Sequence, residues 1–238
     1  MLAIDGLVVR FDGVTALDGV TLAIPAGARV GILGPNGSGK TTLFNAISGL
    51  TALAGGTIRV DGRLTSGLPP HRIAAAGVAR TFQTARLFQR LSVLDNVLPR
   101  VGAGATTSRD ALDSALAALE KVGLADKSEV LAGDLDAFAQ RRLEIARAMA
   151  QRPRLLLVDE PTGGLSRAEA DSIIALLDRG TDPATTILLI EHNISAVEAL
   201  CARSLLLVEG RVAADAATRD MLRDRALASV YFGSGLSQ

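Results

Sequence analysis

The chain has 238 residues, and its 25 basic and 25 acidic side chains give it a formal net charge of zero. This balance argues against broad electrostatic adhesion to nucleic acid or to anionic lipid, so we expect no nucleic-acid partner. The length suits one large α/β domain, the single cysteine (Cys201) permits no internal disulfide, and no apolar run is long enough to span a bilayer.

The first fifth of the chain predicts strands and one helix. Alternating residues at 2–9 and 19–24 bracket an Asp-Gly pair at 12–13 and predict two antiparallel strands. The apolar run Val30–Leu33 predicts a buried strand, and residues 41–49 predict the helix that follows it.

The connection between that strand and that helix reads Gly-Pro-Asn-Gly-Ser-Gly-Lys-Thr-Thr and fits the phosphate-loop pattern G-x-x-x-x-G-K-[ST] at every position. Its glycines let the backbone turn tightly and aim N–H groups at a polyphosphate, and the helix adds the positive end of its dipole. We expect Lys40 to reach the β- and γ-phosphates and Thr41 to ligate Mg²⁺. The residues expected to bind the nucleotide are Gly34, Asn36, Gly37, Ser38, Gly39, Lys40, Thr41 and Thr42.

The rest of the chain alternates strands and helices on the scale of α/β crossovers. The predicted elements, in chain order, are a strand at 57–60, a short helix from 69 to 77, a loop at 101–110, helices at 111–122 and 138–150, a strand at 154–159, a helix at 167–177, a strand at 187–191, a helix at 194–202 and a hairpin of 205–208 with 212–214. This order predicts an α/β fold. We expect a nucleotide-binding core from about 1–83 and 151–238, with an antiparallel β edge at its N-terminus and a helical insertion at about 84–150.

Two buried strands end in polar residues suited to hydrolysis. One apolar run leads into Asp159 and Glu160, and another ends just before His192. Behind a phosphate loop, we expect Asp159 to hold Mg²⁺ directly or through water and Glu160 to polarise the attacking water. His192 is predicted to contact the γ-phosphate or that water. By contrast, His71 is interpreted as a surface residue and Cys201 as a small core residue.

These motifs resemble those of the ATP-hydrolysing subunit of ABC transporters, over essentially the whole chain. The resemblance implies a P-loop NTPase of ABC type, with a mixed central sheet, an N-terminal antiparallel β subdomain and a helical subdomain. It also implies ATP hydrolysis with Mg²⁺. The residues that it implies are Glu160, His192 and Gln83 for catalysis, Thr41, Gln83 and Asp159 for the metal, and Phe11 for stacking on adenine, although an aromatic ring at Phe11 can equally pack within the β edge.

Several segments resemble the importers of branched-chain amino acids in particular, namely residues 77–83, 86–88, 91–97 and 140–147 and the ending 230–233. Those importers combine two different ATPase chains, two membrane permease subunits and an extracytoplasmic binding protein. The resemblance therefore implies these partners and a peripheral location on the cytoplasmic side of the cell membrane. The substrate stays open between branched-chain amino acids and other small polar solutes. The residues expected either to shape the docking groove for the membrane subunits or to pack in the core are Leu87, Phe88, Leu91 and Val93.

One family motif is altered in this chain. Most ABC ATPases carry a signature close to L-S-G-G-Q before the long helix, whereas Asp136, Phe138 and Ala139 replace its serine, its second glycine and its glutamine within Leu135–Ala139. In the family, this helix end meets the γ-phosphate bound by the opposite subunit. A carboxylate about 4 Å from a phosphate oxygen costs on the order of 4 kcal/mol at an effective dielectric near 20. The favourable helix-end contribution is only about 1 kcal/mol. We therefore interpret the signature as degenerate, although Asp136 is still a good helix N-cap; a different local register is the alternative.

The degenerate signature favours a heterodimer over a homodimer. Each ABC site combines the phosphate loop of one chain with the signature of the other, so a partner with an intact signature would complete the Glu160 site of this chain.

The leading interpretation is ATP-driven import, and the alternative is a regulatory or weakly active ABC ATPase without a transport role. A soluble ABC protein of translation or DNA repair is disfavoured because tandem ATPase domains and long coiled-coil insertions are absent. A phosphate-loop kinase or GTPase leaves His192 and the 140–147 segment unexplained. Ser166 stands where many family members have Asp.

Overall fold

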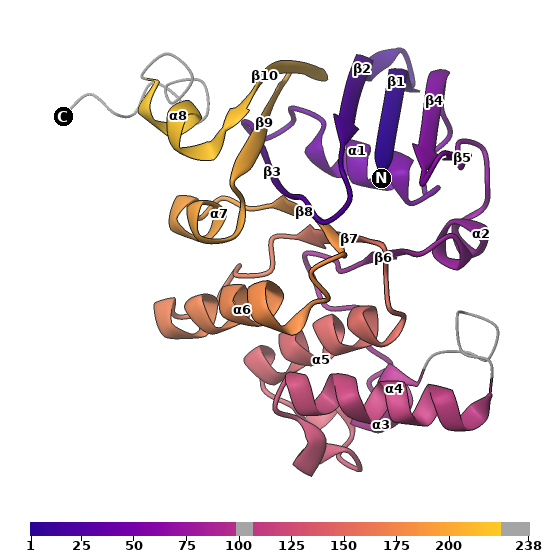
Figure 1. Cartoon of the computed structure of the whole chain (residues 1–238), viewed down its shortest axis with the longest axis vertical. Helices are drawn as coiled ribbons and strands as arrows, with labels where there is room; N and C mark the ends of the chain where they lie inside the picture. Colours follow the sequence, from indigo (N-terminus) through magenta and orange to yellow (C-terminus); the bar gives the residue numbers. More distant parts are fainter. Residues whose placement is uncertain (99–106, 225–238) are drawn as a thin grey trace.

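The computed structural model describes residues 1–98 and 107–224 as two sheets flanked by helices (Figure 1). The strands are β1 (Leu2–Phe11), β2 (Val14–Ile24), β3 (Arg29–Leu33), β4 (Gly55–Val60), β5 (Arg63–Leu64), β6 (Val78–Arg80), β7 (Leu155–Asp159), β8 (Thr186–Ile190), β9 (Arg203–Val208) and β10 (Arg211–Ala217). The helices are α1 (Lys40–Ile47), α2 (Pro70–Ala75), α3 (Val93–Val97), α4 (Ser108–Lys121), α5 (Ala137–Ala150), α6 (Arg167–Gly180), α7 (Ile194–Leu200) and α8 (Thr218–Arg223), with short 3-10 turns η1 (Ala125–Lys127) and η2 (Ala132–Asp134). Most of the predicted loop at 101–110 and all of the 230–233 motif lie outside the described residues.

The two sheets differ in strand direction. The smaller sheet has the order β2-β1-β4-β5, and its pairings are antiparallel. The larger sheet has the order β10-β9-β3-β8-β7-β6, with parallel pairs everywhere except between β9 and β10. The predicted mixed central sheet and N-terminal antiparallel sheet are therefore confirmed.

The inner strands of the larger sheet divide their side chains between two apolar cores. On β7, Leu155 and Leu157 belong to the core shared with the smaller sheet and α1, whereas Leu156 and Val158 belong to the core under α5, α6 and α7. Successive side chains of a strand point to opposite faces, so both faces of this sheet are covered. This explains why these strands read as continuous apolar runs in the sequence.

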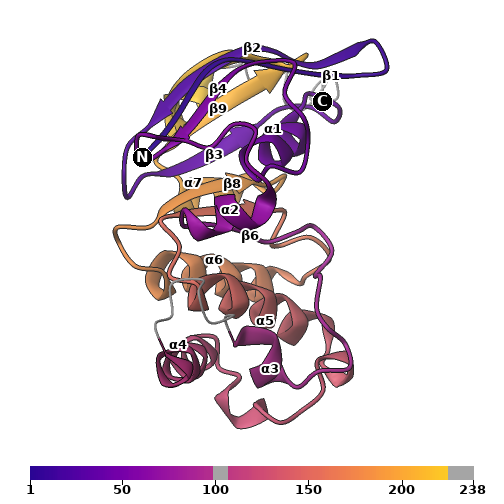
Figure 2. The ribbon, with the colours of Figure 1, turned by 90° about the vertical axis from the view of Figure 1, so that its right-hand side faces the viewer.

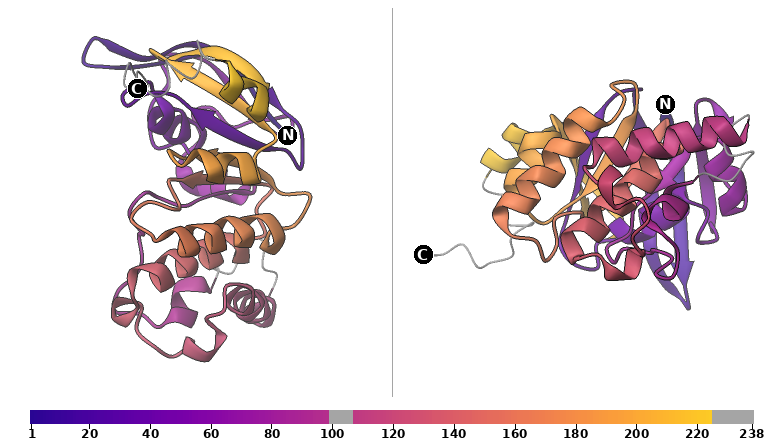
Figure 3. Two further views of the ribbon diagram at one scale, coloured as in Figure 1. Left: turned by 90° about the vertical axis from the view of Figure 1, so that its left-hand side faces the viewer. Right: turned by 90° about the horizontal axis from the view of Figure 1, so that it is seen from below.

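A third apolar core lies among α3, α4 and α5. Helix α5 contributes to two cores. Ile145 belongs to the core that lies between the larger sheet and α5, α6 and α7, called below the core beneath the sheet, and Leu143 belongs to the core among the helices. Figure 2 shows the resulting order of layers, from the sheets through α6 and α5 to α3 and α4, and Figure 3 shows the same order from the other side. Helix α5 is thus the element that joins the helical part to the rest.

Some boundaries differ from those predicted. The second strand begins at Val14 rather than at residue 19, because its first half pairs with the end of β1. Helix α4 begins at Ser108 rather than at 111, because the Thr107 side chain accepts a hydrogen bond from Asp110 N and caps it. The short elements β5, β6 and α3 were not predicted, since two to five residues hold too little periodicity. Within 1–98 and 107–224, none of the helices is both long and apolar enough to cross a membrane.

Candidate nucleotide-binding and catalytic site

Three neighbouring parallel strands end at the same edge of the larger sheet. Gly34 directly follows β3, Asp159 is the last residue of β7, and His192 lies just beyond β8. Ligands of open α/β sheets bind at the carboxyl ends of the strands. This edge is therefore where a nucleotide site is expected.

The phosphate loop has backbone geometry that only glycine tolerates. Gly34, Gly37 and Gly39 have φ angles of 148°, 78° and 103°. A Cβ atom on Gly34 would lie 2.1 Å from the carbonyl oxygen of Leu207, and one on Gly39 would lie 2.6 Å from that of Ala16. Helix α1 begins at Lys40 without a side-chain cap, so the N–H groups of its first turn can bind an anion.

Two polar side chains of this loop, Ser38 and Lys40, are buried, whereas those of Asn36 and Thr41 are exposed. The ammonium group of Lys40 donates hydrogen bonds to the carbonyl oxygens of Gly34 (2.7 Å) and Pro35 (2.9 Å). Burial lowers the pKa of Lys40, and the charges of Glu160 and Asp159 oppose that change. The hydroxyl of Ser38 is buried, and in the described part of the chain it has no hydrogen-bond partner. The Lys40 ammonium, the N–H groups at the start of α1 and the Ser38 hydroxyl are hydrogen-bond donors of one loop, and such a set fits a polyphosphate.

Asp159 is buried at the end of β7 and is held by an arginine from β6. Arg80 Nη2 donates to Asp159 Oδ2 at 3.0 Å, and Arg80 Nη1 donates to Asn45 Oδ1 at 2.7 Å. Burial raises the pKa of Asp159, while the hydrogen bond and charge of Arg80 oppose that rise. Arg80 therefore joins the strand end to helix α1, a role that the sequence analysis missed.

Glu160 is held by side chains from two other segments. Gln83 Nε2 donates to Glu160 Oε2 at 2.8 Å, and His192 Nε2 lies 3.1 Å from Glu160 Oε1. The backbone of Glu160 has φ 45°, and its N–H donates to the carbonyl of Ile190 on β8 at 2.8 Å. The structure thus brings together the three residues that the resemblance implied for catalysis. A carboxylate placed in this way, with part of its surface open to solvent, can accept a proton from a water molecule.

The residue before His192 also belongs to this edge and was not singled out in the sequence. Glu191 is buried, and its Oε1 accepts hydrogen bonds from the N–H and the hydroxyl of Thr162. Its Oε2 accepts from the N–H groups of His192 (2.8 Å) and Asn193 (3.0 Å). Glu191 therefore fixes the His192 loop to the segment that follows Glu160. Glu191 could have been recognised in the sequence as a carboxylate that directly follows a buried strand.

A Mg²⁺ ion is compatible with the oxygen donors that the fold collects. Asp159 supplies a carboxylate and Thr41 a hydroxyl at the start of α1, and hard oxygen ligands are those that Mg²⁺ prefers. Within residues 1–98 and 107–224, no group of three or more His, Cys, Asp or Glu residues could hold a metal ion. Such an ion would therefore take further ligands from water and phosphate oxygens.

The segment that we interpreted as a degenerate signature lies at the N-terminus of α5. Asp136 is exposed and caps this helix, because its Oδ1 accepts a hydrogen bond from Ala139 N at 2.7 Å. The expected N-cap is thereby confirmed. Phe138 packs partly against the core beneath the sheet, with the Arg142 guanidinium 4.7 Å from the ring centroid. Ala139 is fully buried among the helices.

The remaining predicted contact residues fall into exposed and buried sets. Phe11 is 47% exposed and pairs with Val14 at the tip of the β1–β2 hairpin, where a ring can stack on a ligand. Phe88 and Leu91 are exposed as well, and Leu87 is partly buried against the core among the helices. Val93, however, is fully buried in the core among the helices, so it is a core residue and the docking role considered for it is wrong.

His71 and Cys201 are placed as expected. His71 is exposed on α2. Cys201 is buried, and this burial raises the pKa of its thiol to about 12. Neither residue lies among the groups that surround Glu160.

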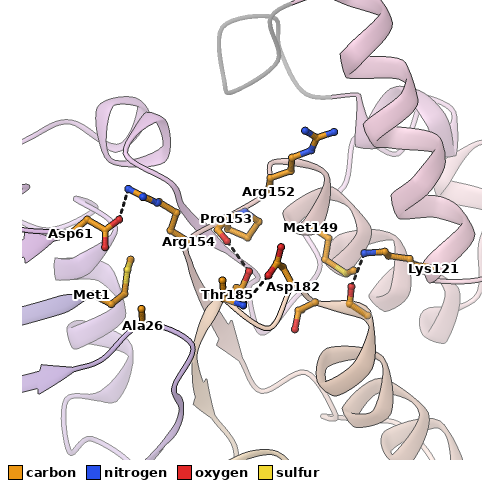
Figure 4. Close-up of a pocket in the computed structure, with 13 residues that line it drawn as sticks. Met1, Ala26, Asp61, Lys121, Met149, Arg152, Pro153, Arg154, Asp182 and Thr185 are labelled. Atoms are coloured by element: carbon orange, nitrogen blue, oxygen red, sulfur yellow. Dashed lines mark hydrogen bonds and ion pairs between the residues drawn. The ribbon is translucent and has the colours of Figure 1, made fainter.

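A separate cavity of about 470 Å³ lies at the opposite edge of the sheet (Figure 4). Arg154 and Thr185, which line it, directly precede β7 and β8, so the cavity is at the amino ends of the strands. Several of its polar groups bond to backbone atoms, as Lys121 Nζ does to the carbonyl of Gly180 at 3.0 Å. It is therefore distinct from the phosphate-loop edge.

Comparison with known proteins identifies the family. Residues 17–163 match the family model described as ABC transporter. BraF of Pseudomonas aeruginosa, a high-affinity branched-chain amino acid transport ATP-binding protein, is 38% identical over 240 residues, which cover 94% of each chain. LivG of Escherichia coli, which carries the same description, is 35% identical over 98% of each chain. LptB of Escherichia coli, a lipopolysaccharide export system ATP-binding protein, is 30% identical over 98% of this chain and 97% of its own.

Solved structures agree with this result. The ADP conformation of MJ1267, an ATP-binding cassette of an ABC transporter, has a TM-score of 0.87 and 26% identity and covers 98% of both chains. The dimeric post-hydrolysis state of the cassette MJ0796, bound to ADP and Pi, has a TM-score of 0.80 and 26% identity over 92% of this chain and 99% of its own. The resemblance seen in the motifs is confirmed. The chain belongs to the ABC transporter family, as one of its ATP-hydrolysing cassettes.

Proposed function

We propose that this chain is the ATPase motor of an importer for branched-chain amino acids or related small polar solutes. The observation that carries the proposal is the convergence of Gln83 and His192 on Glu160, beside the buried Asp159. The identity with BraF and LivG over nearly the whole chain supports the substrate class. The match to LptB favours a common motor that serves different substrates.

In this proposal, each side chain at the strand edge has one role in hydrolysis. Lys40 and the N–H groups of the phosphate loop bind the β- and γ-phosphates, and Phe11 stacks on adenine. Glu160 accepts the proton of the attacking water, and Gln83 and His192 orient Glu160 and that water. Asp159, Thr41 and Gln83 would hold Mg²⁺, and the ion would supply positive charge to the phosphate oxygens.

The catalytic unit that we propose is an asymmetric pair of cassettes. The negative charge of Asp136 lies at the helix end that would meet the nucleotide of the opposite subunit, and its Oδ1 already accepts from Ala139 N. An anion is stabilised at a helix N-terminus, so a carboxylate there competes with the phosphate. A partner with an intact signature would complete the Glu160 site, while the partner's own site would face Asp136. The dimer of MJ0796 with ADP and Pi shows that a related cassette pairs after hydrolysis.

The remaining partners are membrane permease subunits and, through them, an extracytoplasmic binding protein. The exposed Phe88 and Leu91 near Gln83 support docking on an apolar surface at the cytoplasmic side of the membrane. We also propose the division into a nucleotide-binding core (about 1–83 and 151–238) and a helical subdomain (about 84–150). Its support is the separate apolar core among α3, α4 and α5.

Two substitutions test this proposal in the complex with the cognate ATPase chain and permeases. Glu160→Gln should lower ATP turnover by at least about a hundredfold, because it removes the general base. Asp136→Ser should raise total turnover, because it restores a hydroxyl donor and removes a negative charge from the partner's site. Glu198→Gln, an exposed change on α7, is the matched control and should leave turnover unchanged. Unchanged turnover in Glu160→Gln would show that the active site is assigned wrongly.

The second candidate is a regulatory or weakly active cassette, and Asp136 is the observation that favours it. The two functions differ in the same assay. If Asp136→Ser leaves turnover unchanged and the complex does not transport solute, the regulatory function is supported and the motor function is not.

A further inference from the structure

One face of α5 carries three charged residues directed at the segment that holds Gln83. Arg141, Glu144 and Arg147 are spaced by three residues and therefore share one side of the helix. They belong to the 140–147 segment, which the proposed hydrolytic roles leave unused. Each of them bonds to the stretch from Phe82 to Arg86.

Both backbone polar groups of Phe82 are bonded to this helix face. Its N–H donates to Glu144 Oε1 at 2.9 Å, and its carbonyl oxygen accepts from Arg141 Nη1 at 2.7 Å. Arg141 Nη2 also donates to the carbonyl oxygen of Gln83 at 2.6 Å. Farther along, Arg147 Nη1 donates to the carbonyl oxygen of Arg86.

The central pair is buried and internally neutral. Arg141 is 7% exposed and Glu144 is 1% exposed, and Arg141 Nη1 donates to Glu144 Oε2 at 2.9 Å. Both oxygens of Glu144 are therefore used, one by the Phe82 backbone and one by Arg141. Charge-assisted hydrogen bonds away from water are strong and directional. Such a pair holds a backbone segment in one position.

We propose that Arg141 and Glu144 are positioning residues that set the Gln83 side chain against Glu160. The inference rests on the proposed function, because it takes the contact of Gln83 with Glu160 as part of hydrolysis. Gln83 itself is exposed, and a side chain on an exposed segment needs an external support to keep a fixed place. The hydrogen bonds from Arg141 to the carbonyl oxygen of Gln83, and from Arg141 and Glu144 to the backbone of Phe82, supply that support.

The same helix begins at the altered signature. Asp136 caps α5, and Arg141 lies five positions farther along that helix. A shift of α5 caused by the nucleotide of the opposite subunit would move Arg141 and Glu144, and with them Gln83. In the proposed pair of cassettes, Arg141 and Glu144 would therefore link the helix end that faces the partner's nucleotide to the Glu160 site of this chain.

The test replaces both members together, because removal of Arg141 alone leaves a buried unpaired carboxylate that can unfold the chain. Arg141→Met with Glu144→Met removes the hydrogen bonds to residues 82 and 83 without leaving an unpaired buried charge. Arg142→Met is the matched control, since Arg142 also donates from α5 to backbone carbonyls, but to Val122 and Gly123 within the helical part.

Two measurements in the complex with the cognate partners distinguish a positioning role from a merely structural one. The double variant should lower kcat about tenfold, because a small misplacement of a catalytic group costs one to two orders of magnitude. Its affinity for ADP should be unchanged, because the phosphate loop is untouched. In a Gln83→Ala background the double variant should have no further effect on kcat, whereas the effect of Arg142→Met should be the same in both backgrounds. Amide exchange at 82–86 should become faster in the double variant and not in the control.

Failure of this inference is separable from failure of the proposed function. If Gln83→Ala lowers kcat but the double variant lowers it equally with and without Gln83, the positioning role is wrong and the proposed function stands. Unchanged amide exchange at 82–86 would also overturn the inference. If Gln83→Ala leaves kcat unchanged, the role proposed for Gln83 is wrong, and the positioning role is wrong with it.

Discussion

At the scale of single residues, the site depends on side chains whose environment opposes their charge. Lys40 and Asp159 are both buried. Burial lowers the pKa of Lys40 and raises the pKa of Asp159, so it favours the neutral form of each. Each is partly compensated by a nearby opposite charge, which for Asp159 is the Arg80 guanidinium. A bound phosphate would add negative charge, which favours the charged form of Lys40 and disfavours that of Asp159.

The lowered pKa of Lys40 predicts a pH dependence of nucleotide binding. Lys40 loses its positive charge at a lower pH than an ordinary lysine, so the affinity for ADP should fall as the pH rises through that lowered pKa. Titration calorimetry across mildly alkaline buffers measures this. Lys40→Met should bind weakly with no such step. If the wild-type chain shows no step either, Lys40 is not the group that senses pH.

At the scale of elements, helix caps explain sequence departures that look functional. Ser166 caps α6 in a capping box, with its hydroxyl and N–H both bonded to the Glu169 side chain. Ser and Asp are equally good N-caps, so Ser166 replaces the more usual Asp without local cost. Asp136 caps α5 in the same way. Its departure from serine is therefore locally neutral. In the proposed pair of cassettes, its consequence would lie in the negative charge that it presents to the partner.

Loss of the α6 cap should lower stability by a predictable amount. Ser166→Ala should reduce the free energy of unfolding by about 1 kcal/mol, because it leaves N–H groups of the first turn without an acceptor. Denaturant unfolding followed by circular dichroism measures it. Ser172→Ala, an exposed change within the same helix, should alter the free energy by no more than about 0.5 kcal/mol. Equal effects of the two substitutions would contradict the capping role.

The sequence predicted the fully buried strands better than the shortest elements. The runs that form β7 and β8 were predicted to within one residue at either end, because both are fully buried and flanked by clear breaks. β6 was missed, although it carries Arg80, because three residues show no periodicity. Its strand character comes from parallel pairing with β7.

At the scale of the whole molecule, three apolar cores are linked through α5 and the central sheet. The core beneath the sheet contains Cys201, which is the only cysteine of the chain and is 1% exposed. Its thiol therefore reports on the opening of that core. The raised pKa adds to this protection, because only the thiolate reacts.

Cys201 should resist alkylation in the native protein. With a pKa of about 12 and a buried sulfur, its labelling by iodoacetamide at neutral pH should be slow and should accelerate as urea opens the core. Mass spectrometry after timed labelling measures the rate, and the fully unfolded chain serves as the fast reference. Complete labelling of the native protein at the unfolded rate would contradict the burial of this residue.

The phosphate loop was determined by the sequence alone, because nine contiguous residues set its turns and no distant partner is needed to recognise them. The strand ends at Asp159 and Glu160 were predictable for the same local reason. Only the tertiary structure decided which side chains meet. Gln83 and Glu160 are 77 positions apart, and Glu160 and His192 are 32 apart. Their contacts therefore depend on which parallel strands are neighbours in the sheet. The hydrogen bonds of Arg141 and Glu144 to the Phe82 backbone could not be predicted from the sequence either. An arginine and a glutamate on a helix do not reveal which backbone segment they face.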